Sequence, residues 1–214
     1  MSNSGAPSAV QPNATGISDE IIFKKELLDY VSGFQVLSPE EIDLIMDNTL
    51  VKSFKKGAYL LEEGQVADKC YFVLKGCVRE FYLIDGEEKS TAFYTEGQAV
   101  NSFSSYTNQQ PSRHYLICAE DCVLTVGNQQ IEKEMCQRIP RLESIIRQEV
   151  ERNTGKAQDD FARFMVSSPE QRYLQMLEDR PELLQRIPQH QLASYIGITA
   201  ESLSRIRKRL HKQT

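Results

Sequence analysis

The sequence predicts an α+β chain made of an antiparallel β jelly roll, one long helix and a small unit of short helices. Three observations lead to this fold class. Between Leu50 and about Gly127, short β-rich segments are separated by glycines roughly every ten residues, which is typical of a β-sandwich or barrel. A long helical pattern follows Pro140. Near the C-terminus, two short helical segments are separated by Gly197.

The N-terminal region places helices before the β-rich part. Residues 1–18 carry no charged side chain and are rich in Ser, Asn, Gly, Ala, Pro and Gln, which predicts a disordered tail. This tail lacks the basic start and apolar core of a signal peptide, so we expect a cytoplasmic protein. Residues 19–31 have the pattern of a short amphipathic helix. Ser38, with Glu41 three residues later, forms a capping box that starts a helix ending near Asn48.

The five cysteines indicate reduced thiols. An odd number without an export signal is typical of a cytoplasmic chain. Cys118 and Cys122 lie four residues apart in one predicted strand, hence roughly 13 Å apart at about 3.3 Å per residue. That distance excludes a disulfide between them. We expect small buried hydrophobic side chains, with a redox sensor as the alternative.

The long helix is predicted over residues 140–166, a length of about 40 Å at 1.5 Å per residue. Its apolar residues follow a helical period, so this stripe needs a partner. The partner is either the chain's own β-domain or the same helix of a second copy. Asn153, Thr154 and Gly155 interrupt the stripe, and such a polar break fixes a register or faces a ligand.

A separate helical unit is predicted to begin at Ser168, which caps a helix together with Gln171. Within this unit, residues 188–196 form a short helix, Gly197 makes the turn, and Thr199 caps a second helix from Ala200. This is the pattern of a helix-turn-helix, whose second helix enters the major groove of DNA.

Charge supports this interpretation. Residues 163–214 carry nine Lys and Arg against five Asp and Glu, a net charge of +4, whereas residues 1–162 have a net charge of −9. On the second helix, Arg205 can donate two hydrogen bonds to guanine, Glu201 can accept one from cytosine, and Ser204 can contact a base. The phosphate contacts expected beside these base contacts are Thr199, Arg207, Lys208, Arg209 and Lys212.

The segment "IPQHQLASYIGITAESLSRIRKRL" resembles the DNA-binding end of the Crp/Fnr superfamily of bacterial transcription regulators. The segment "FKKGAYLLEEGQVADKCYFVLKGCVREFYLIDGEE" resembles that family's cyclic-nucleotide-binding-like jelly roll. Glu201, Ser204 and Arg205 match the family's "ExxSR" recognition residues. The resemblance implies a tail (1–18), an effector-sensing jelly-roll domain (19–139), a dimerisation helix with hinge (140–167) and a helix-turn-helix DNA-binding domain (168–214). It also implies a homodimer, without membrane association, that binds a palindromic promoter site in double-stranded DNA and contacts RNA polymerase.

The resemblance further implies an effector pocket, where this sequence departs from the pattern that binds cyclic AMP. Arg113 stands at the family's phosphate-binding arginine, but His114 replaces Ser or Thr, and Ser102 and Phe103 replace Gly and Glu. The adenine-contacting positions of the long helix correspond to Ala157 and Gln158, and the polar break adds Asn153 and Thr154 to the candidate pocket. These departures argue against cyclic AMP and leave the effector unidentified. The first cysteine is Cys70, so an iron–sulfur cluster is not expected, and no metal site is predicted.

Two other classes of function fit the sequence less well. A ligand-binding module that acts on a protein partner without specific DNA binding is the alternative, and the basic second helix argues against it. An enzyme is not expected, because HExxH, GxSxG, GxxxxGK[ST] and GxGxxG are all missing from the sequence.

Overall fold

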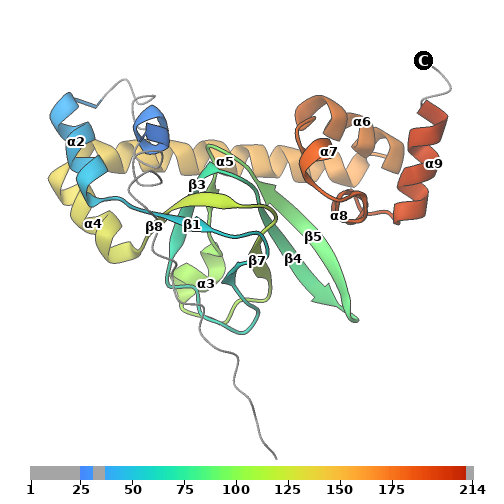
Figure 1. Ribbon diagram of the computed structural model, residues 1–214, viewed down its shortest axis with the longest axis horizontal. Coiled ribbons are helices and arrows are strands. Elements are labelled where there is room, and N and C mark those ends of the chain that lie inside the picture. Colours follow the sequence, from blue (N-terminus) through green and yellow to red (C-terminus); the bar gives the residue numbers. More distant parts are fainter. Residues whose placement is uncertain (1–24, 31–36, 211–214) are drawn as a thin grey trace, which may run out of the picture.

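The computed structural model describes residues 25–30 and 37–210, and it contains a β jelly roll, a long helix and a helical unit in the predicted order (Figure 1). A short helix covers residues 25–30. The predicted tail, the rest of the predicted 19–31 helix and Lys212 lie outside the described residues. Within the described part, none of the helices combines the length and the apolar content that a membrane span needs.

The jelly roll consists of two four-stranded antiparallel sheets, in the orders β1-β8-β3-β6 and β2-β7-β4-β5. The strands are β1 (Leu50–Phe54), β2 (Tyr59–Leu61), β3 (Cys70–Lys75), β4 (Val78–Ile84), β5 (Glu87–Tyr94), β6 (Ala99–Val100), β7 (Tyr115–Cys118) and β8 (Cys122–Gly127). Apolar side chains between the sheets form the core, in which Val73, Val78 and Leu124 are fully buried. The predicted jelly-roll class is therefore confirmed.

The hairpin between β4 and β5 turns at the predicted residues, Asp85 and Gly86. Both have positive φ, 52° and 80°, as a two-residue turn of this kind requires. The turn directs β5 back along β4, with Ile84 opposite Glu87. Strand β5 is the last strand of its sheet, so its outer edge is free to pair with another part of the molecule.

The helices that the sequence predicts begin and end close to the expected positions, and further helices accompany them. They are α2 (Pro39–Asn48), α3 (Phe103–Asn108), α4 (Gln129–Arg138), α5 (Pro140–Val166), α6 (Pro169–Asp179), α7 (Leu183–Arg186), α8 (Gln189–Tyr195) and α9 (Ala200–Leu210). Both predicted capping boxes are present, Ser38 with Glu41 on α2 and Ser168 with Gln171 on α6. In each, the two residues exchange hydrogen bonds that satisfy backbone N–H groups at the helix start.

Helix α5 joins the two ends of the molecule and passes along the jelly roll (Figure 1). It runs without a break through Gly155, so the polar segment interrupts the apolar stripe but not the helix. Every residue from 150 to 166 is exposed. The exposed fractions of Phe161, Met165 and Val166 are 66%, 64% and 85%. This half of the stripe is therefore not covered by the described part of the chain.

The prediction that Cys118 and Cys122 lie in one strand was wrong. Cys118 ends β7 and Cys122 begins β8, because the chain reverses at residues 119–121, where the Ala119 N–H binds the Cys77 carbonyl at 2.8 Å. The Cys122 thiol donates to the carbonyls of Cys77 at 3.4 Å and Glu120 at 3.3 Å. Interaction between the two neighbouring thiols acts to raise the pKa of Cys118 and to lower that of Cys122. The spacing that excluded a disulfide therefore does not hold. The expectation of burial is confirmed for Cys77, Cys118 and Cys122.

Candidate nucleic-acid interface and effector region

Helix α9 is anchored by its apolar face. Leu203 and Ile206 are buried, and they share a core with Leu192 and Ile196 of the preceding helix. Thr199 caps α9 as predicted, because its Oγ1 accepts a hydrogen bond from the Ser202 N–H at 3.2 Å. The apolar contacts fix which face of α9 points outward.

The turn before α9 depends on Gly197, whose φ is +75°. A Cβ at this position would lie 3.1 Å from Arg172 Nη1 and 3.2 Å from Phe164 Cζ. Arg172 stacks on the Phe164 ring at 3.8 Å and donates hydrogen bonds to the carbonyls of Phe164 (3.1 Å) and Ile196 (3.2 Å). A single guanidinium thus connects the end of α5 to the turn of the helix-turn-helix.

The outward face of α9 carries the predicted base contacts. Glu201 and Arg205 are exposed, and Ser204 is half-buried beside them. The pKa of Glu201 lies below its usual range, because its carboxylate accepts hydrogen bonds from its own backbone N–H and from Thr199 and lies near Arg205. Glu201 is therefore ionised at neutral pH and is available as an acceptor.

The residues of α9 that are predicted to contact phosphates differ in whether another side chain already binds them. Lys208 is exposed on the outer side of α9. Arg207 donates to Gln189 Oε1 at 3.4 Å. Arg209 turns back to Glu170 of α6, with Nε 3.3 Å from Oε1. Binding a phosphate through Arg209 would require it to leave this ion pair.

Gln189 and His190 at the start of α8 are site residues that were not predicted from the sequence. Both are exposed, and together with Ala200, Glu201 and Ser204 they line one open groove. Their position at the start of the first helix, on the side that faces the second, is the signal that could have identified them. The groove extends the candidate interface beyond α9.

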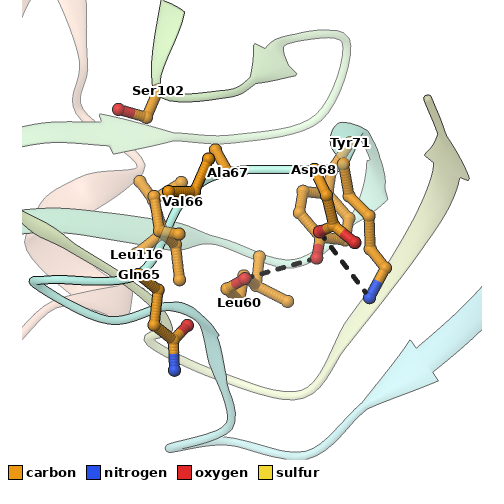
Figure 2. A pocket seen from close by; sticks show the side chains of 10 residues that line it. Leu60, Gln65, Val66, Ala67, Asp68, Tyr71, Ser102 and Leu116 are labelled. Carbon is orange, nitrogen blue, oxygen red and sulfur yellow. Dashed lines mark hydrogen bonds and ion pairs between the residues drawn. The ribbon is translucent and has the colours of Figure 1, made fainter. Parts of the chain in front are cut away.

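Of the predicted effector residues, Ser102 lines a cavity of about 100 Å³ inside the jelly roll (Figure 2). Its side chain is buried and its Oγ has no hydrogen-bond partner among the described residues. Elsewhere around this cavity, Tyr71 donates to the Leu60 carbonyl at 3.3 Å, and Asp68 lies 4.0 Å from Lys69. The cavity is therefore lined by both polar and apolar groups, with Leu61 and Leu116 among the apolar ones.

The other predicted residues of the jelly roll do not line this cavity. Phe103 is 60% exposed and Arg113 is exposed. His114 is buried, with Nε2 3.7 Å from the Glu80 carboxylate. Glu80 in turn accepts hydrogen bonds from Thr91 at 2.7 Å and from the Tyr94 hydroxyl at 3.0 Å. Glu80 was not predicted from the sequence, because its partners Thr91 and Tyr94 lie on the neighbouring strand β5.

A cyclic nucleotide does not fit the residues present. Pockets for small ligands usually measure about 300–1,000 Å³, whereas this cavity has about 100 Å³. The partly buried carboxylate of Glu80 would repel an anionic phosphate beside His114. The predicted positions on α5 are all exposed and none of them lines the cavity: Asn153, Thr154, Ala157 and Gln158. Among the described residues, no three His, Cys, Asp or Glu side chains converge as a metal site.

Comparison with known families agrees with this architecture. Residues 51–138 match the family model of the cyclic nucleotide-binding domain. Comparison with curated proteins gave no match. The match runs from β1 to the end of α4 and thus spans the jelly roll.

Solved structures share the fold over most of the chain. A c-di-GMP-responsive global regulator, CLP, from Xanthomonas campestris is 16% identical and has a TM-score of 0.64, covering 82% of this chain and 93% of that one. FixK2 from Bradyrhizobium japonicum is 19% identical with a TM-score of 0.63, covering 77% and 85%. The catabolite activator protein of Thermus thermophilus is 21% identical with a TM-score of 0.51, covering 84% and 86%. The fold that the Crp/Fnr resemblance implies is confirmed, because the chain shares the fold of these regulators.

Proposed function

We propose that this protein is a homodimeric, sequence-specific DNA-binding transcription regulator of the Crp/Fnr type. The observation that carries the proposal is the two-sided nature of α9. Leu203 and Ile206 hold its inner face in a core, while Glu201, Arg205 and Lys208 are exposed on its outer face. This is the arrangement that a recognition helix needs to enter the major groove.

The proposed dimer rests on α5. Phe161, Met165 and Val166 expose large apolar side chains on the half of α5 next to the helix-turn-helix. Pairing this half with the same helix of a second copy would bury these side chains. It would also place two α9 helices on one side of a dimer, as a palindromic site requires.

The proposed regulator works in the cytoplasm and acts at promoters through RNA polymerase. It has no catalytic role, and its effector is not a cyclic nucleotide, because the interior around Glu80 and His114 does not fit one. The family resemblance, the buried Ser102 hydroxyl and the small cavity support a sensory role for the jelly roll.

The proposal is tested by selecting binding sites from a pool of randomised duplexes with the full chain. We expect a palindromic consensus containing a G·C pair in each half-site, with half-site centres about 34 Å apart. Binding to the selected duplex should fall steeply as salt is raised, since phosphate contacts release counterions. Enrichment of no sequence, with equally weak binding to every duplex, would contradict specific DNA binding. It would favour a module that acts on a protein partner instead.

A further inference from the structure

The helical unit formed by α6–α9 is docked on its own jelly roll, at the outer edge of β5 (Figure 1). We propose that Arg186 and Ser194 are positioning residues, which hold this docked arrangement and thereby set the half-site spacing that the dimer accepts. The inference rests on the proposed function. Its basis is a set of apolar, hydrogen-bonded and ionic contacts between the two parts of the chain.

Apolar side chains make the docking contact continuous. Phe93 of β5 and Cys77 are buried in the same cluster as Leu192 and Ile196 of the helical unit. The Phe93 ring also meets Tyr195 of α8 edge-on, with 5.3 Å between the ring centroids. Because one core spans both parts, the helical unit is held by the jelly roll as well as by α5.

Ser194 attaches α8 to the edge strand. Its Oγ accepts a hydrogen bond from the Ser90 N–H at 3.0 Å and donates one to the Glu88 carbonyl at 3.2 Å. Both partners are backbone groups of β5, whose outer edge has no neighbouring strand. The hydroxyl of Ser194 thus binds backbone groups with which a neighbouring strand could otherwise pair.

Arg186 ties α7 to two carboxylates of the jelly roll. It binds Glu96 with both terminal nitrogens, at 2.8 and 2.9 Å, and its Nε lies 3.1 Å from a Glu120 oxygen. Its side chain is 22% exposed, so this two-pronged ion pair is partly shielded from water. Nearby, Arg180 donates to the Phe93 carbonyl at 3.3 Å and to the Thr95 hydroxyl at 3.2 Å.

The docked arrangement is compatible with DNA binding. The contacts use the end of α6 together with α7 and α8, whereas Glu201, Arg205 and Lys208 on α9 stay exposed. In a dimer paired along α5, each α9 is thus tied to its own jelly roll as well as to α5. The distance between the two α9 helices is then fixed by docking, so only one half-site spacing suits both.

The test inserts 2 base pairs at the centre of the duplex selected by the full chain and measures the change in Kd. The native chain should lose about 100-fold or more in affinity, because only one half-site remains within reach. Arg186→Glu should lose less than about 10-fold on the same insertion, because its helical units can adjust. Ser194→Ala, a milder change, should show an intermediate loss. Adding Glu96→Arg to Arg186→Glu restores an ion pair of reversed polarity and should bring back the native dependence on spacing.

Lys89→Ala is the matched control, because Lys89 is an exposed cation of β5 that pairs with Glu87 within the jelly roll. It should keep the native dependence on spacing. If Arg186→Glu and Ser194→Ala both fold, shown by native-like circular dichroism, and lose as much affinity as the native chain, the inference is overturned. Tighter binding by these variants with unchanged dependence on spacing would overturn it too. If the native chain selects no duplex, the proposed function itself fails; if it does select one, the comparison of variants tests the positioning role alone.

Discussion

Replacing Gly197 with Ala tests the structure of the helix-turn-helix at its tightest point. Gly197 has a φ of +75°, and an added Cβ would lie 3.1 Å from Arg172 Nη1 and 3.2 Å from Phe164 Cζ. Two separate effects should therefore destabilise the variant. One is the left-handed backbone, and the other is crowding of the group that connects α5 to the turn.

The expected magnitude follows from these two effects. A left-handed conformation costs an L-residue roughly 1–2 kcal/mol, and the lower chain entropy of unfolded Ala offsets about 0.4–1 kcal/mol of this. Displacing Arg172 weakens its hydrogen bond to the Ile196 carbonyl, and a hydrogen bond from a charged donor contributes about 1.5–3 kcal/mol. We expect Gly197→Ala to lower the free energy of unfolding by about 2–3 kcal/mol.

Gly97→Ala is the matched control for the backbone effect. Gly97 has a similar φ of +81°, but nothing lies within 4 Å of an added Cβ. Urea denaturation followed by circular dichroism should give a loss of about 1 kcal/mol for this variant. The difference between the two variants measures the crowding at Arg172. Equal losses at both glycines would refute the role assigned to Arg172.

Four further outcomes are expected. Arg205→Ala should weaken binding to the selected duplex by about 1–3 kcal/mol and relax the preference at one base pair per half-site in competition assays. Lys208→Ala should weaken binding to every duplex about equally. It should also lower the slope of the logarithm of the binding constant against the logarithm of the salt concentration by about 1 per half-site. Phe161→Glu combined with Met165→Glu should convert the proposed dimer to monomer in sedimentation experiments. An unchanged mass would contradict the proposed pairing of two α5 helices. Burial acts to raise the pKa of Glu96, but hydrogen bonds from Arg186 and from backbone N–H groups hold it below its ordinary value of 4.5. The stability that this lowered pKa adds is present above about pH 4.5 and is lost as the pH falls through the lowered pKa. Over that pH range, the urea midpoint should therefore fall more steeply for the native chain than for Glu96→Gln.

Local signals in the sequence predicted the elements well, because they depend on neighbouring residues. Ser38 with Glu41 and Ser168 with Gln171 are short-range capping boxes, and both start helices where expected. The positive φ values of Asp85 and Gly86 follow from the same kind of local rule. The exposed face of α9 could also be predicted, because helical periodicity separates its apolar and polar sides.

Contacts between distant residues could not be predicted in this way. Arg186 and Glu96 are 90 residues apart, and nothing in the sequence near either residue indicates their ion pair. The cysteine error has a related cause, because the reversal after Cys118 depends on the hydrogen bond from Ala119 to the distant Cys77. Glu80 was missed for the same reason, since its partners Thr91 and Tyr94 lie on the next strand.

Helix α8 receives two connections that enter the helical unit from different sides. Arg172 joins the carbonyl of Ile196, directly after α8, to Phe164 on α5. Ser194, two residues earlier, joins α8 to β5 of the jelly roll. Because α8 has only seven residues, both connections act on one short rigid body. A change in the proposed α5 pairing can therefore reach α9 through Arg172, and a change in the jelly roll can reach it through Ser194, Arg186 and the apolar contact of Phe93 with Tyr195. Because both routes act on α8, a movement of α9 that follows one of them strains the contacts of the other.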